Sequence, residues 1–157
     1  MAIEIVRKYF EELGVAEKIQ EFEVSSATVE LAAQALGCEG ARIAKSLSFL
    51  VGEGKAILVV AAGDARIDNA KYKKEFSAKA KMLSAEQVVN LIGHAVGGVC
   101  PFAINEGVEV YLDESLKRFE TVFPACGSSN SAIELTMNEL ELYAKPVKWV
   151  DVCKNWE

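Results

Sequence analysis

Two adjacent glycines followed by a proline are the residues of this chain best suited to hold a ligand through the main chain. Gly97 and Gly98 lie in the otherwise apolar run His94–Phe102, and Pro101 comes three residues after the second glycine. Glycine lets another group approach the backbone closely, and proline fixes its own φ and keeps the preceding residue extended. The pattern predicts a rigid bend whose N–H and C=O groups face a ligand or, in the simpler alternative, a tight turn between two buried elements.

A lysine in an apolar strand could supply a cation for such a site. By the period-two rule, Lys45 shares one face of the predicted strand Ile43–Val51 with Ile43, Leu47 and Phe49. Burying an isolated ammonium group is costly, so this side chain should bind an anion or, alternatively, reach water at a sheet edge.

Together, a lysine and a bend without side chains would suffice to hydrolyse an activated ester. Lys45 would hold a phosphate or a carboxylate, while the backbone at Gly97 and Gly98 would orient a water molecule or polarise a carbonyl. A single well-placed oxyanion donor accelerates such reactions by about 10²–10³-fold, and positioning of the reactants adds to this.

Sequence signals for a cysteine nucleophile, a metal site or a catalytic carboxylate pair are weaker. The chain has one histidine and no CxxC pair, so we expect no metal site; its four cysteines are Cys38, Cys100, Cys126 and Cys153. Cys100 and His94 lie close in the sequence and could form a nucleophilic pair, with a buried inert thiol as the alternative. Nothing singles out a catalytic pair among the 23 acidic residues.

Composition indicates one folded domain of 157 residues, with 51% hydrophobic residues and a net charge of −6. The apolar runs are too short to span a bilayer and we see no secretory signal, so we expect a cytoplasmic protein with no membrane partner. An acidic chain lacks the basic face that long nucleic acids require. Arg66 and the lysines between Lys71 and Lys81 form a local basic cluster, which is either a solvated face or a place for a phosphate backbone.

Periodicity and capping signals predict alternating short helices and strands. The expected helices are Ile3–Leu13, Val29–Leu36, Asp68–Phe76, Ser84–Ile92 and Thr136–Ala144, with a helical turn at Asp113–Phe119. The expected strands are Lys18–Val24, Ile43–Val51, Ala56–Ala62, Val108–Leu112, Thr121–Ala125, Ser131–Leu135 and Val147–Val152. This describes a single α+β domain over residues 1–157, with a curled mixed sheet that approaches a barrel.

Four segments of the chain, in this order, resemble the YbaK/prolyl-tRNA synthetase-associated editing-domain family. They are Ala44–Leu47, the strand Ala56–Val60, the bend Gly93–Phe102 and the segment Gly127–Thr136. The lysine combined with a G-x-x-P bend is more specific than either feature alone. The resemblance implies a trans-acting hydrolase that deacylates misacylated aminoacyl-tRNA, notably a mischarged tRNA(Pro).

The same resemblance assigns roles to individual residues. Lys45 matches the family lysine that contacts the terminal nucleotide and its phosphate, and Gly98 matches the glycine whose backbone helps to place the scissile carbonyl or the attacking water. Pro101 matches the proline that fixes the bend, and Ser46 keeps the hydroxyl that relatives often carry as Thr. The other implied substrate-binding residues are Gly97, His94, Gly127, Ser128 and Ser129.

The resemblance also defines cofactors and partners. It implies water-mediated or substrate-assisted attack, without a covalent enzyme intermediate and without a metal or organic cofactor. The partner would be the 3′ end of an aminoacyl-tRNA, with a synthetase as a possible source of the substrate. His94, Cys100 and the Gly-Ser-Ser-Asn turn are similar to a distinct subgroup, so the amino acid removed stays open. The alternative function is a non-catalytic module that binds a nucleotide or a tRNA 3′ end.

Overall fold

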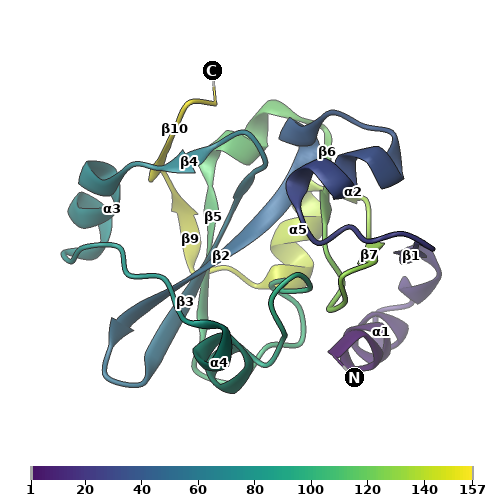
Figure 1. Ribbon diagram of the computed structural model, residues 1–157, viewed down its shortest axis with the longest axis horizontal. Coiled ribbons are helices and arrows are strands. Elements are labelled where there is room, and N and C mark those ends of the chain that lie inside the picture. Colours follow the sequence, from purple (N-terminus) through teal and green to yellow (C-terminus); the bar gives the residue numbers. More distant parts are fainter. Residues whose placement is uncertain (1, 157) are drawn as a thin grey trace.

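Strand β3 (Lys55–Ala62) lies at the centre of a curled mixed sheet in the computed structural model, which describes residues 2–156 (Figure 1). Every residue of β3 after Lys55 is buried, as expected for a run of small and branched apolar side chains packed on both faces. The other strands of this sheet are β2 (Ile43–Gly52), β5 (Glu109–Asp113), β6 (Thr121–Pro124), β8 (Leu135–Thr136) and β9 (Lys148–Val150).

The six strands follow the order β8-β6-β2-β3-β5-β9. The β2–β3 hairpin and the β6–β8 pair are antiparallel, whereas β6 runs parallel to β2, β5 to β3 and β9 to β5. Two small antiparallel pairs lie outside the sheet: β1 (Gln20–Glu21) with β7 (Ser131–Ala132), and β4 (Arg66–Ile67) with β10 (Cys153–Lys154). The predicted fold class, α+β with a curled mixed sheet, is confirmed.

The helices surround this sheet, and four of them begin at a side-chain cap. They are α1 (Ala2–Glu12), α2 (Val29–Leu36), α3 (Asn69–Phe76), α4 (Ala85–Gln87) and α5 (Met137–Ala144), with 3₁₀ turns η1 (Ala16–Lys18), η2 (Gly40–Arg42) and η4 (Glu114–Arg118). Ser84 and Thr136 both form complete capping boxes, and α4 continues as the π-helical turn η3 (Val88–Ile92). Within residues 2–156, no helix has the length and apolar character needed to cross a membrane.

Two strand predictions are wrong in extent. The predicted strand Lys18–Val24 is reduced to β1, because its two large apolar residues, Ile19 and Phe22, are three positions apart and cannot share one face of a strand. The predicted strand Ser131–Leu135 is divided into β7 and β8. Its interruption lies at Ile133, which is buried and donates its N–H to the carbonyl of Pro124 (3.0 Å).

Helix α1 packs its predicted apolar face on the end of the glycine–proline bend. Val6 and Phe10 are fully buried. The ring of Phe10 lies 4.8 Å from that of Phe102 and 5.6 Å from that of Tyr143 in edge-on geometry. Phe102 is therefore fixed in the core, and with it the C-terminal end of the bend.

The buried carboxylate of Asp113 joins β5 to the C-terminal segment. Its Oδ1 accepts a hydrogen bond from the N–H of Val152 (2.9 Å) and its Oδ2 one from Ser115 (3.0 Å). An unpaired buried N–H costs about 1–3 kcal/mol, so Asp113→Ala should lower the free energy of unfolding by about 2–5 kcal/mol in urea titrations. The control is Asp151→Ala, which removes an exposed partner of Lys71 and should cost less than about 1 kcal/mol. Equal losses in the two variants would contradict this role of Asp113.

Candidate active site

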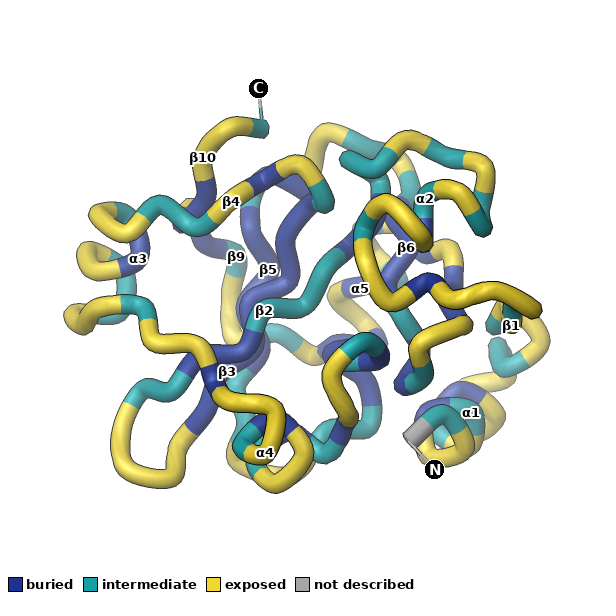
Figure 2. Tube along the Cα trace, viewed as in Figure 1, coloured by how far each residue is buried: buried dark blue, intermediate teal, exposed yellow. Residues whose placement is uncertain are grey.

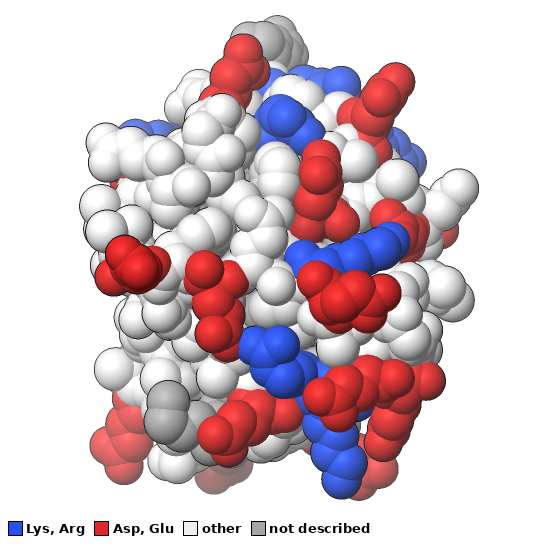
Figure 3. Space-filling view, turned by 90° about the vertical axis from the view of Figure 1, so that its right-hand side faces the viewer, with Lys and Arg blue, Asp and Glu red and all other residues white. Residues whose placement is uncertain are grey.

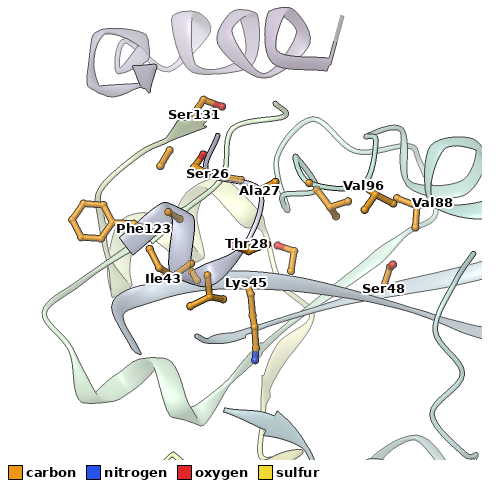
Figure 4. A pocket seen from close by; sticks show the side chains of 18 of the residues that line it. Ser26, Ala27, Thr28, Ile43, Lys45, Ser48, Val88, Val96, Phe123 and Ser131 are labelled. Carbon is orange, nitrogen blue, oxygen red and sulfur yellow. The ribbon is translucent and has the colours of Figure 1, made fainter. Parts of the chain in front are cut away.

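A cavity of about 300 Å³ lies where the edge pairing of β2 is interrupted (Figure 4). Strand β6 pairs with β2 only as far as Ala44. Further along the same edge, residues 81–83 pair with β2 through the carbonyl of Ser48 (3.2 Å) and the N–H of Leu50 (2.8 Å). The edge between Ala44 and Ser48 faces the cavity instead of a neighbouring strand.

Four parts of the chain form the wall of this cavity. The stretch before and within α2, strand β2, the 96–99 part of the bend and the β6–β7 region all contribute, as Figure 4 shows. Of the described residues in the wall, Lys45 is the charged one and the polar others carry hydroxyls. The lining residues used below are Ser26, Ala27, Thr28, Lys45, Ser46, Met82, Leu83, Val96, Gly97 and Ser131.

Lys45 contributes its half-buried stem to the wall, while its ammonium group points away from the labelled residues above it in Figure 4. Its Nζ donates hydrogen bonds to the carbonyl oxygens of Gly63 (3.4 Å) and Ala65. Burial lowers the pKa of Lys45 from its ordinary value. The sequence predicted an anion or open water as the partner of this ammonium, and the turn after β3 provides main-chain oxygens instead.

Ser46 lines the cavity through its main chain. Its hydroxyl, by contrast, is buried and has no hydrogen-bond partner among the described residues. Main-chain groups two residues apart on a strand face the same edge, and those of Ser48 and Leu50 face the 81–83 segment. The N–H and C=O of Ser46 therefore face the interrupted edge as well.

The glycine pair forms a bend that is packed from behind. Gly97 lines the cavity with a φ of +95°. A Cβ on Gly98 would lie 2.6 Å from the N of Ser128 and 2.7 Å from the carbonyl carbon of Gly127, so only glycine fits there. The N–H of Gly98 donates to the carbonyl of Ala95 (3.0 Å) within the bend itself. Gly98 thus lies behind Gly97, in contact with the turn at Gly127 and Ser128.

The turn at residues 127–129 supports the wall without lining it. The carbonyl of Ser129 accepts a hydrogen bond from the N–H of Ser26 (2.6 Å), and the hydroxyl of Ser128 lies 2.7 Å from that of Ser131. Ser26 and Ser131 line the cavity. The predicted residues Ser128 and Ser129 therefore act on the cavity through these two serines.

His94 and Cys100 lie together in the core. A carbonyl can only accept, so His94 Nε2 donates to the oxygen of Phe102 (2.8 Å), and Cys100 Sγ lies 3.5 Å from the same nitrogen. His94 Nδ1 is buried and has no partner among residues 2–156. Burial raises the pKa of Cys100 to about 12 and lowers that of His94, which favours the inert-thiol alternative over a nucleophilic pair.

The predicted site is therefore brought together in part. Lys45, Ser46 and Gly97 share one cavity wall, and Gly98 with residues 127–129 lies directly behind it. His94 and Pro101 lie outside the lining, and Pro101 faces Tyr9 and Tyr143 on the opposite side of the bend. Ser26, Ala27 and Thr28 were not predicted as lining residues, because Ser26 and Thr28 are ordinary capping residues before a helix and Ala27 carries no functional group.

Comparison with known proteins identifies the family. Residues 23–142 match the family described as aminoacyl-tRNA editing domain, which includes every segment of the cavity wall. The chain belongs to this editing-domain family. It is 56% identical over 158 residues to the uncharacterized protein YwhH of Bacillus subtilis (strain 168), with all of both chains covered.

Solved structures support the same family. A crystal structure of a protein proposed as a trans-editing enzyme for prolyl tRNA synthetase is 31% identical, with a TM-score of 0.86 over 98% of this chain and 97% of that one. The hypothetical protein APE2540 is 27% identical, with a TM-score of 0.84 over 96% and 99% of the two chains. The resemblance predicted from the sequence is confirmed.

The close contact at Gly98 predicts a large effect of a single methyl group. In Gly98→Ala, the new Cβ would overlap the backbone at residues 127–128, which cannot move as a side chain would. We expect the free energy of unfolding to fall by about 1–3 kcal/mol in urea titrations. Gly52→Ala is the control, because its Cβ would meet nothing within 4 Å. The contact would be unimportant if both variants had the stability of the wild type.

His94 predicts a dependence of stability on pH. It is the chain's one histidine, and its pKa in the folded state is lowered from 6.5 by burial. As the pH falls below about 6.5, the unfolded chain binds a proton that the folded protein does not, so stability should fall by up to about 1.4 kcal/mol per pH unit. Urea unfolding at pH 7.5 and 5.5 would measure this, with His94→Leu expected to flatten the difference. An equal slope in wild type and variant would exclude His94 as its source.

Proposed function

We propose that this protein is a trans-editing hydrolase that deacylates misacylated aminoacyl-tRNA in the cytoplasm, with mischarged tRNA(Pro) as its expected substrate. Membership of the editing-domain family supports the reaction. The structural neighbour proposed as a trans-editing enzyme for prolyl tRNA synthetase supports the choice of tRNA. On this proposal residues 1–157 act as one editing domain, and a synthetase is the natural source of the mischarged tRNA.

The observation that carries the proposal is the cavity at the interrupted edge of β2. It brings Lys45, Ser46 and Gly97 into one wall, although the lysine and the bend are far apart in the sequence. Its volume of about 300 Å³ is at the lower end of small-molecule sites, which fits an aminoacyl group better than a whole nucleotide.

The mechanism needs no side-chain nucleophile. Water adds to the ester carbonyl, the bond from the acyl carbon to the ribose oxygen breaks, and that oxygen takes up a proton to leave free tRNA and amino acid. Main-chain groups at Ser46 and at the bend set by Gly98 would orient the carbonyl and the water. Lys45 would exchange its carbonyl partners at Gly63 and Ala65 for the terminal nucleotide's phosphate. The fully buried Cys100 thiol supports this route over a covalent intermediate.

The chemistry of the wall favours a small, uncharged amino-acid side chain. The described lining holds no carboxylate, so a cationic side chain would lose its hydration without gaining a partner.

The test is deacylation of a panel of misacylated tRNAs by wild type, Lys45→Ala and Lys45→Met. Removing a charged hydrogen-bond donor should lower kcat/KM roughly 10- to 100-fold in both variants. Lys45→Met keeps most of the stem that lines the cavity, and melting temperatures would show whether lost bonds to Gly63 and Ala65 affect folding.

Two outcomes would contradict parts of this proposal. Unchanged hydrolysis in folded Lys45→Met would remove Lys45 from the mechanism. Saturable binding of an aminoacyl-adenosine mimic without turnover of any ester would instead identify a non-catalytic binding module.

A further inference from the structure

A basic stretch of chain lies next to the cavity of this acidic protein. Residues 66–81 contain six basic and two acidic residues, whereas the whole chain has a net charge of −6. The stretch covers α3 and the segment that leads from it to α4, on the left of Figure 1, and much of this segment is exposed (Figure 2). We call Lys73, Lys79 and Lys81 the lysine tract.

The lysine tract consists of side chains that are available to a ligand. Lys73 and Lys79 come from different segments and line one shallow hollow together with Asn69, and the described lining of this hollow holds no carboxylate. Lys71, on the same helix, differs because its Nζ donates to Asp151 Oδ1 (3.1 Å) and to the carbonyl of Cys153 (3.0 Å). Two lysines that converge on a hollow without an acid repel each other unless an anion binds between them.

The tract continues to the mouth of the cavity. Lys81 is exposed and directly precedes Met82 and Leu83, which line the cavity and lie along the edge of β2. At the mouth, Met82 and Val96 are 61% and 64% exposed, which is high for apolar side chains and leaves a surface on which a base can rest. Residues 79–82 therefore lead along the chain from the hollow to the rim of the cavity, where Val96 also lies.

The opposite side of the molecule is richer in acidic groups. Figure 3, seen from the right of Figure 1 and hence from the side away from α3, shows carboxylates spread over this face, with a smaller number of Lys and Arg side chains between them. The first 39 residues, which include α1, contain eight acidic and three basic residues. A polyanion is therefore repelled from that side and attracted to the lysine tract.

From these observations we infer that the lysine tract binds the phosphate backbone of the substrate RNA and leads its 3′ end to the cavity. Lys73, Lys79 and Lys81 contact phosphates, the terminal base lies on Met82 and Val96, and the acyl group enters the cavity. The inference rests on the proposed function for its ligand, and it adds the surface that selects an RNA end over a free aminoacyl ester.

The test measures binding of a deacylated RNA hairpin that ends in single-stranded CCA, at several salt concentrations. Lys79→Glu and Lys81→Glu should each weaken binding roughly tenfold at low salt and reduce the slope of log Kd against log salt by about 0.7–0.9. The matched control is Lys8→Glu, which makes the same charge change on an exposed position of α1 and should leave the slope unchanged. Wild-type slopes in the tract variants, or equal losses in all three, would overturn the inference.

A second measurement separates this inference from the proposed function. On aminoacyl-tRNA, Lys79→Glu should raise KM and leave kcat near the wild-type value, whereas hydrolysis of an aminoacyl-adenosine without phosphodiesters should equal that of the wild type. Equal losses on both substrates would place Lys79 in the cavity chemistry and overturn the tract. If the wild type hydrolyses no ester, the proposed function fails, and the hairpin comparison still decides whether the tract binds RNA.

Discussion

The site depends on an interrupted edge of strand β2. A strand edge carries N–H and C=O groups that need partners, and two separate segments supply them on either side of Ser46. The last rung with β6 is at Pro124, and after it Ala125 pairs with Ala132 and not with β2. The 81–83 segment leaves the edge where Ser84 caps α4. Two segments distant in sequence thus leave one stretch of edge open for a ligand.

The bend can present bare main chain to the cavity only because its other side is firmly packed. Phe102 is held in the core by Phe10, whose ring also packs on Tyr143, and the carbonyl of Phe102 accepts a hydrogen bond from His94 at the start of the bend. Gly98 lies against the turn at residues 127–128. Packing behind the wall therefore offsets the conformational entropy that the glycines lose on folding. The residues that the resemblance assigns to substrate binding fall into two groups: some line the cavity, and others hold it in shape.

What could be predicted from the sequence was set by local chemistry. Capping boxes at Ser84 and Thr136 and the apolar run of β3 need no distant partner, and they were predicted correctly. The partners of Lys45 could not be predicted, because they are carbonyls of a turn some twenty residues away in the chain. The Ser26 part of the wall is placed by its bond to Ser129, which no periodicity in either segment indicates.

Charge distribution explains how an acidic protein can act on a polyanion. With a net charge of −6, the molecule as a whole repels RNA, so extended non-specific binding is weak. Attraction confined to the lysine tract, which ends at the cavity mouth, favours binding of the free end of an RNA, because only that end can enter the cavity. A complex held by only a few phosphate contacts also dissociates readily. A trans-acting editing enzyme that samples many correctly charged tRNAs must release each of them quickly. On the proposed function, the acidic surface and the lysine tract together favour binding of the tRNA terminus.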